Sequence, residues 1–214
     1  MEVMAGFIKG NGEFKNLQVY KMAVIISVAT DIFVKRFIDS RSRTTDQMQQ
    51  AARSCKQNLV EGSDAAPTSK ETEIKLTNVA RASLGELLED YEDYLRFNSL
   101  EVWGVNHPRV ERLRDYLKKE AFEQEYPKLL PKLNGEEFCN LMITLILQER
   151  RLIDGLLKRQ QQRFLEDGGI REAMTRSRLE TRKNQNSPNN RNNPNNPSPP
   201  ITPITPSPQI TPKN

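Results

Sequence analysis

The sequence predicts an all-α protein: an up-and-down four-helix bundle with a helical insert between the third and fourth long helices and a disordered C-terminal tail. Four long stretches carry apolar residues at three- and four-residue intervals, which is the period of an amphipathic helix. Alternating strand patterns of any length are absent from the sequence. The last stretch is rich in Asn, Pro, Ser and Thr and holds nine of the thirteen prolines, so it lacks the apolar surface that would offset its ordering entropy.

The first helix is expected over residues 17–38. Its apolar arc is wider than the core of a bundle requires, and we expect part of it to face a second subunit. The arc consists of a stripe that three further residues widen: Leu17, Tyr20, Val24, Val28 and Ile32, with Ile25, Ala29 and Phe33 beside them.

The second helix is expected to begin after Thr44 or Thr45, either of which can act as an N-cap, and to end at Gly62 as a C-cap glycine. Its apolar face is formed by Met48, Ala52, Cys55 and Leu59.

The third helix is expected over residues 70–97, which at about 1.5 Å per residue gives it the length of a bundle axis. Small residues on the second and third helices predict that these two approach closely. Because glycine inside a helix costs about 1 kcal/mol relative to alanine, we expect Gly85 to be there for packing. The small residues are Ala51, Ser54, Ala80, Ala82, Ser83 and Gly85.

Residues 98–133 form the predicted insert, with a loop around Trp103, one short helix over residues 109–124, and breaks at Pro127 and Pro131. The fourth long helix is expected to begin after Asn134, a favourable N-cap, and to stop at residues 168–169, a pair of glycines.

These elements define four segments. They are an N-terminal extension (1–13), the four-helix bundle (14–169, including the insert 98–133), a basic C-terminal arm (170–183) and the disordered Asn/Pro-rich tail (184–214).

Composition narrows the functional class. The chain carries 32 basic and 28 acidic residues, with basic zones at 35–60 and 158–183 and an acidic zone at 84–97. No apolar run is long enough to span a membrane, and no secretory signal is recognisable, so we expect a cytoplasmic protein. Cys55 and Cys139 sit at apolar helix positions, where buried free thiols are expected.

Catalytic motifs are not recognisable in the sequence. His107 is the only histidine, and it stands in a loop, where we expect a surface residue. A di-iron site in a helical bundle requires two Glu-x-x-His pairs, and Cys–His or Ser–His catalysis requires a positioned histidine. We therefore predict no enzymatic activity, no catalytic residues, no metal site and no cofactor.

Four sequence motifs resemble those of one bacterial family. Residues 47–62, QMQQAARSCKQNLVEG, match a pattern Gln-x-x-x-Ala-Ala-x-Ser-x-x-x-Asn-x-x-Glu-Gly, and residues 79–87, VARASLGEL, match its third-helix motif. The chain is similar in these motifs to the four-helix bundle family that includes rRNA intervening-sequence proteins and the accessory variability determinants of diversity-generating retroelements. Residues 103–109 and 164–176 resemble the branch called the four-helix bundle suffix domain.

The resemblance implies a homopentamer of four-helix bundles that binds a reverse transcriptase, and RNA or DNA through a positive surface. Many relatives have two arginines where this chain has Gln49 and Gln50. Arg53 and Lys56 follow one turn later, and further cations lie in the basic arm. The candidate nucleic-acid-binding residues are Arg53, Lys56, Arg171, Arg176, Arg178, Arg182 and Lys183.

The sequence leaves three hypotheses about function open. The leading hypothesis is a non-enzymatic oligomeric accessory or scaffold protein that engages a reverse transcriptase or nucleic acid by electrostatics. The alternative is a purely structural homo-oligomer that binds a protein partner without nucleic acid. An enzyme with a site assembled between subunits is the third and weakest hypothesis.

Overall fold

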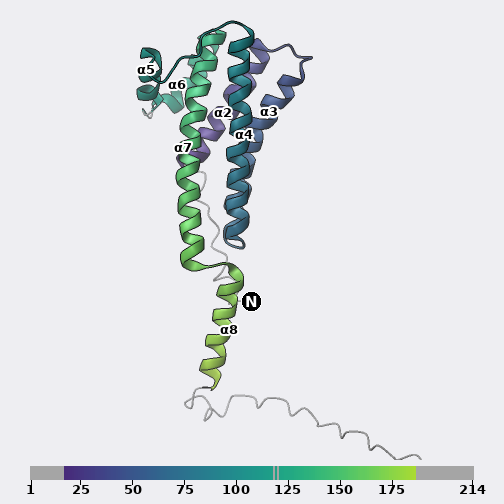
Figure 1. Ribbon diagram of the computed structural model, residues 1–214, viewed down its shortest axis with the longest axis vertical. Helices are drawn as coiled ribbons and strands as arrows, with labels where there is room; N and C mark the ends of the chain where they lie inside the picture. The colour runs from purple at the N-terminus through teal and green to yellow at the C-terminus, as the bar shows by residue number, and fades with distance from the viewer. Residues whose placement is uncertain (1–16, 118, 120, 187–214) are drawn as a thin grey trace, which may run out of the picture. The chain divides into compact units, whose positions relative to one another are not determined.

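Helices make up most of the described part of the chain, residues 17–117, 119 and 121–186 of the computed structural model, and no strand occurs within it (Figure 1). The predicted N-terminal extension, residues 1–13, and the predicted tail beyond residue 186 lie outside the described residues. The elements are α2 (Gln18–Phe37), α3 (Arg43–Ala65), α4 (Lys70–Phe97), α5 (Pro108–Leu117), α6 (Ala121–Leu129), η2 (Leu130–Lys132), α7 (Gly135–Asp167) and α8 (Ile170–Asn186).

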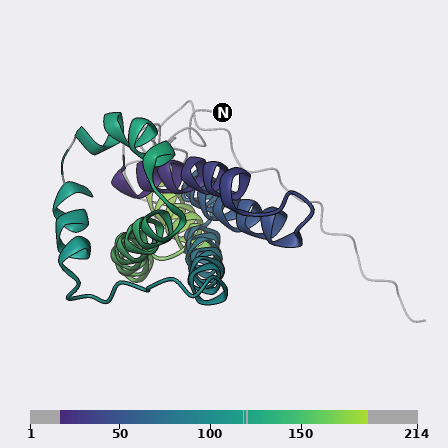
Figure 2. The same cartoon turned by 90° about the horizontal axis from the view of Figure 1, so that it is seen from above.

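The four long helices α2, α3, α4 and α7 pack in cyclic order, each against the next (Figure 2). Their facing sides form one apolar core, because each helix buries a stripe of residues at helical spacing. At one end of this core Phe33 packs edge or tilted against the rings of Tyr91, Tyr94 and Phe138. The buried hydroxyl of Tyr91 donates a hydrogen bond to Thr30 Oγ1 at 3.0 Å, so its polar atom is satisfied inside the core.

The predicted boundaries of α4 and α7 agree with the structure. The Ser69 side chain accepts a hydrogen bond from the backbone N–H of Thr72 at the start of α4. At the start of α7, Asn134 and Glu137 form a reciprocal capping box. Gly168 follows the end of α7 with φ 69°, a conformation that favours glycine.

The expected end of α3 at Gly62 is wrong. The helix is capped at its start by Ser42 rather than by a threonine, and it continues through Gly62 to Ala65. A side chain at position 62 would place its Cβ 3.3 Å from the carbonyl oxygen of Glu73 and 3.4 Å from Leu76 Cβ. Gly62 therefore serves close packing of α3 against α4 and is not a cap.

The close contact between α3 and α4 includes a hydrogen bond between the hydroxyls of Ser54 and Ser83 at 2.9 Å. Ala52 is almost completely buried, as its place on the predicted apolar face of the second helix requires. Gly85, however, does not belong to this contact, because a Cβ at that position would meet no atom within 4 Å. The packing explanation for Gly85 is therefore wrong, and nothing in the structure explains the glycine.

The insert contains two helices where the sequence predicted one. The predicted helix over 109–124 divides into α5 and α6, and Pro127 stands inside the last turn of α6 without preventing helix formation upstream. Phe122 and Leu130 from the insert are buried in the main core.

Hydrogen bonds join the insert to α2. The Arg36 guanidinium donates to the carbonyl oxygens of Leu130 at 2.7 Å and Leu133 at 2.9 Å. The insert packs on α7 and α2, so part of the wide apolar arc of α2 is covered within the chain.

The chain divides into two units between Ile170 and Arg171. The second unit contains the predicted basic arm, which forms the helix α8 and continues past Lys183 to Asn186.

Candidate nucleic-acid interface

The two candidate cations on α3 lie on the side of that helix away from the core. Arg53 is exposed and its Nε donates to Gln57 Oε1 at 3.3 Å, while Lys56 is half-buried. Arg53 lines an open groove of about 650 Å³ together with the carboxylates of Asp46 and Glu61. A groove with one cation and two carboxylates does not present a positive surface to a phosphate backbone.

The neighbouring glutamines Gln49 and Gln50 of α3 differ in their environments. Gln49 is half-buried and donates from Nε2 to Asp31 Oδ1 on α2 at 2.8 Å, so it links two helices. Gln50 is exposed and borders the same groove as Arg53. Gln49 therefore supplies a neutral donor for Asp31.

The remaining candidate cations lie on α8. The side chains of Arg176, Arg178, Arg182 and Lys183 are all exposed, whereas the side chain of Arg171 lies outside the described residues. At 3.6 residues per turn, Arg178 and Arg182 lie one turn apart on one ridge of the helix, and Arg176 and Lys183 form a second ridge. The structure thus places the arm's cations on one helix, in two ridges on opposite sides of it, and places Arg53 and Lys56 on another.

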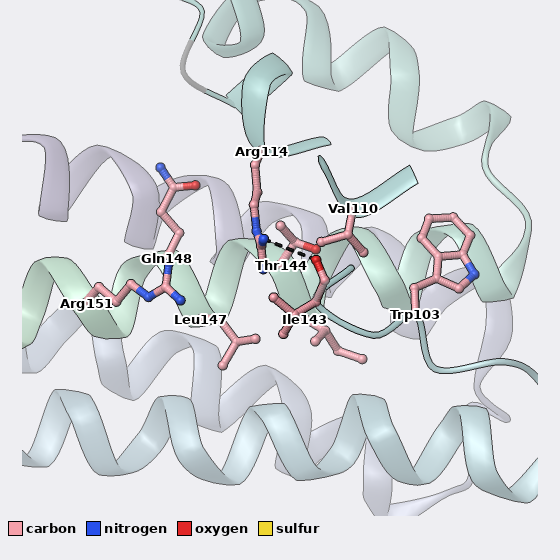
Figure 3. A pocket seen from close by; sticks show the side chains of 9 residues that line it. Trp103, Val110, Arg114, Ile143, Thr144, Leu147, Gln148 and Arg151 are labelled. Atoms are coloured by element: carbon pink, nitrogen blue, oxygen red, sulfur yellow. Dashed lines mark hydrogen bonds between the residues drawn. The ribbon is translucent and has the colours of Figure 1, made fainter. Parts of the chain in front are cut away.

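A second cationic feature, not predicted from the sequence, is a groove between α5 and α7, which we call the α5–α7 groove (Figure 3). Its volume is about 330 Å³, and it contains two arginines and no carboxylate. Figure 3 shows it extending from Trp103 at one end to Arg151 at the other. The lining residues are Trp103, Val105, Val110, Arg114, Ile143, Thr144, Leu147, Gln148 and Arg151.

One wall of this groove depends on the loop that follows α4. The buried Asn140 side chain accepts a hydrogen bond from the Trp103 backbone N–H at 2.7 Å and donates to the Glu101 carbonyl oxygen at 2.8 Å. The indole N–H of Trp103 donates to Glu136 Oε1 at 3.1 Å. These bonds fasten the loop to the first turns of α7.

His107 is also part of this loop structure rather than a free surface residue. Its ring stacks on Trp103 with centroids 5.0 Å apart, and its Nδ1 accepts a hydrogen bond from the backbone N–H of Arg109. The Arg109 guanidinium lies 5.1 Å from the centroid of the Trp103 ring. Trp103 is 8% exposed, so its ring is not available as a stacking platform for a nucleic-acid base.

Buried ionisable groups occur in the main core. Burial raises the pKa of the thiols of Cys55 and Cys139, and both are free cysteines, as predicted. Glu149 of α7 is fully buried, and burial raises the pKa of its carboxyl from 4.5 to about 9. Neither carboxyl oxygen has a hydrogen-bond partner among the described residues.

A buried polar network connects α4 and α7. Gln160 Nε2 donates to Glu73 Oε1 and to Thr77 Oγ1, each at 3.0 Å, and Arg163 donates to the same oxygen of Glu73 at 2.8 Å. Glu73 is 5% exposed, and its carboxylate accepts hydrogen bonds from one neutral donor and one charged donor. This network holds the two helices together and engages Oε1 of the Glu73 carboxylate in hydrogen bonds.

In the part of the chain that the structure describes, no three His, Cys, Asp or Glu side chains come together as a metal-binding group. None of the described helices combines the length and the apolar character needed to cross a bilayer.

Comparisons with known proteins do not extend the resemblance noted from the sequence motifs. No protein-family model matches the chain, and neither the curated proteins nor the solved structures contain a match to it.

Proposed function

We propose that the chain is a non-enzymatic, oligomeric accessory or scaffold protein of the cytoplasm that binds nucleic acid through α8. In this proposal the cyclic packing of α2, α3, α4 and α7 is an up-and-down four-helix bundle with a helical insert, as in the family that the sequence motifs resemble. A reverse transcriptase is the protein partner that the resemblance implies.

The observation that carries the nucleic-acid proposal is the exposed pair of basic ridges on α8. Arg178 and Arg182 on one ridge, and Arg176 and Lys183 on the other, are all exposed. Phosphate contacts need accessible cations rather than base-specific geometry, and each neutralised phosphate releases counterions. In an oligomer the helix is present once per subunit, so individually weak contacts add through multivalency.

Absence of catalysis is part of the same proposal and rests on the state of the candidate groups. The thiols of Cys55 and Cys139 are kept protonated by burial, and a protonated thiol is a poor nucleophile. The only histidine is stacked on Trp103, and its Nδ1 already accepts a backbone hydrogen bond.

The test measures binding of a structured RNA across a salt series. The full-length protein and a form truncated after Gly169 are compared with two double variants, Arg178→Gln/Arg182→Gln on α8 and Arg53→Gln/Lys56→Gln on α3. We expect the α8 variant to reduce the slope of log K against log salt by about 2, because two phosphate contacts are lost. The α3 variant removes the same charge and serves as the matched control.

The pattern of RNA binding among these forms distinguishes a site on α8 from a site on α3. Equal binding by the full-length and truncated forms would reject α8 as the site, and a loss confined to the α3 variant would return the site to Arg53 and Lys56. If no form binds RNA at low salt, the nucleic-acid proposal fails.

The alternative function is a purely structural homo-oligomer that binds a protein partner. The mixed charge around Arg53, where Asp46 and Glu61 border the same groove, favours this alternative over RNA binding by α3. This alternative would be supported if none of the forms binds RNA at any salt concentration while the protein remains a stable oligomer.

A further inference from the structure

The α5–α7 groove combines an apolar floor with cationic walls. Ile143, Leu147 and Arg151 follow one another at four-residue spacing on α7, so one face of that helix passes from apolar to cationic along the groove. Leu147 is 39% exposed and Val105 on the loop is 67% exposed, although the helical unit has a core that buries most of its large apolar residues. These two side chains leave apolar surface open at the rim.

The charge of the groove is unbalanced. Arg151 has no hydrogen-bond or ion-pair partner among the described residues, and Arg114 uses one nitrogen, Nη1, to donate to the Val105 carbonyl oxygen at 3.3 Å. The neighbouring grooves beside α3 and α4 contain carboxylates next to their arginines, whereas this one contains none. An occupant that brings carboxylates would therefore complement it.

We propose that the α5–α7 groove is a docking site for an acidic segment of a protein partner, with one apolar side chain of that segment seated on Ile143 and Leu147. Its carboxylates pair with Arg114 and Arg151, whose planar guanidinium groups suit paired hydrogen bonds to carboxylates. The volume of about 330 Å³ accommodates a side chain and its neighbours rather than a whole helix.

A phosphodiester backbone fits the groove less well than an acidic peptide. It would bring charge but no apolar group, so Leu147 and Val105 would stay exposed to water beside the bound strand. The Trp103 ring at the end of the groove is covered and cannot stack on a base. The inference goes beyond the proposed RNA contact of α8 and does not depend on it, because the groove lies wholly within residues 103–151.

The experiment uses the full-length protein and a short fluorescein-labelled peptide in which a leucine stands between glutamates. Binding is followed by fluorescence polarisation and, with the unlabelled peptide, by the emission of Trp103. Because Trp103 is the only tryptophan of the chain and lines the groove, its emission reports binding at this place.

Arg151→Glu is the test variant and Lys158→Glu is its matched control, since both replace an exposed cation on α7 with a carboxylate. We expect Arg151→Glu to weaken binding by about tenfold or more and to abolish the Trp103 response, because an attraction becomes a repulsion. Lys158→Glu should leave both signals unchanged. A peptide with serine in place of leucine should bind more weakly to the unaltered protein, because the apolar contact is lost.

Three results would overturn the proposal. The first is equal peptide affinity for the unaltered protein and Arg151→Glu, both with native far-UV circular dichroism. The second is complete displacement of the peptide by a single-stranded oligonucleotide with loss of the Trp103 response, which would assign the groove to phosphate. The third is a fall to the monomer mass in light scattering for Arg151→Glu while the unaltered protein is an oligomer, which would assign the groove to a second copy of this chain.

Discussion

At the scale of single residues, Glu149 is a group whose environment departs strongly from its ordinary one. Its carboxyl is fully buried in α7, and neither oxygen has a hydrogen-bond partner among the described residues. Burial raises the pKa of the Cys55 thiol on α3, and the electrostatic effect of Glu149 raises it further. A buried carboxyl of this kind is kept neutral at pH 7, at a cost to stability.

This position also marks a limit of reading the sequence. Glu149 falls within the apolar period of α7, where the sequence predicts core residues, but glutamate is usually a surface residue. Helical spacing places residue 149 on the core face, but the exclusion of water from it depends on the packing of the other long helices around α7.

We predict that Glu149→Gln removes a pH-dependent loss of stability. The folded-state pKa of about 9 lies above the unfolded value of 4.5, so the folded state binds the proton more tightly. The resulting stabilisation is complete below pH 4.5 and is lost as the pH rises towards 9. The difference in unfolding free energy between Glu149→Gln and the unaltered protein should therefore grow by about 3 kcal/mol from pH 4.5 to pH 7 in favour of the variant.

Urea unfolding followed by circular dichroism at several pH values measures this difference. Glu111→Gln is the control, because Glu111 is exposed and its replacement changes the same chemical group without changing burial. A difference that stays constant from pH 4.5 to pH 9 would show that Glu149 is not buried as a neutral acid.

At the scale of elements, the sequence predicted helices best where a polar cap borders an apolar period. Asn134 and the glycine at 168 bracket α7, and Ser69 begins α4, as the local chemistry requires. Gly62 was misread because a glycine that ends a helix and a glycine that admits a neighbouring helix look alike in one sequence. The distance from position 62 to the Glu73 carbonyl oxygen distinguishes the two cases, and it depends on tertiary packing.

The candidate sites likewise divide into one that a local segment predicts and one that depends on tertiary packing. The exposed cations of α8 were predictable from a basic segment with little to bury, whereas the α5–α7 groove was not. Arg114 and Arg151 are distant in sequence and come together only because α5 packs on α7. The polar Asn140 inside an apolar run of α7 was the one local signal that something else docks there.

We predict that Asn140→Ala detaches the loop that carries Trp103 from α7. The substitution removes an acceptor from the buried Trp103 backbone N–H and a donor from the Glu101 carbonyl, at a cost of about 1–3 kcal/mol. Trp103 emission should shift to the red and become more accessible to acrylamide. The helix content measured by far-UV circular dichroism should stay nearly constant.

Asn78→Ala is the comparison for this substitution. Asn78 also donates from its side chain to a carbonyl oxygen one turn back, that of Ile74, but it holds no loop. An unchanged emission spectrum in Asn140→Ala would mean that the Trp103–Glu136 bond and the ring contacts hold the loop without it.

At the scale of the whole molecule, one surface that remains open is the outer groove between α3 and α4. The insert covers α7 and α2 (Figure 2), while the groove between α3 and α4 has a volume of about 710 Å³. Its walls combine small residues, Ala51 and Ser83, with Val79, which is 45% exposed. Such a surface admits the backbone of another helix at close range.

The carboxylates of this groove also favour a contact with a second subunit. The pKa of Asp90 in the same groove is raised by desolvation and then by the nearby carboxylates of Asp93 and Glu86. Crowded carboxylates gain from a cationic partner, and the basic zone at 35–60 of a second subunit has the complementary sign. Residues 35–42 of that zone do not line this groove, so a contact made through them would be heterologous, and a heterologous contact that closes gives a ring.

We predict that the full-length protein is larger than a monomer in light scattering at micromolar concentration, with the mass of a pentamer as the expectation from the family resemblance. Val79→Glu should dissociate it, because it replaces an apolar contact with a further carboxylate beside Asp46, Glu86 and Asp90. Val105→Glu makes the same change at another exposed valine, 67% accessible and outside this groove, and should leave the mass unaltered. A monomeric mass for the unaltered protein would reject the ring and, with it, the multivalent presentation of α8. A stable oligomer in which Val79→Glu changes nothing would instead move the subunit contact to the exposed side of α2, where Leu17 and Val28 are each 42% accessible.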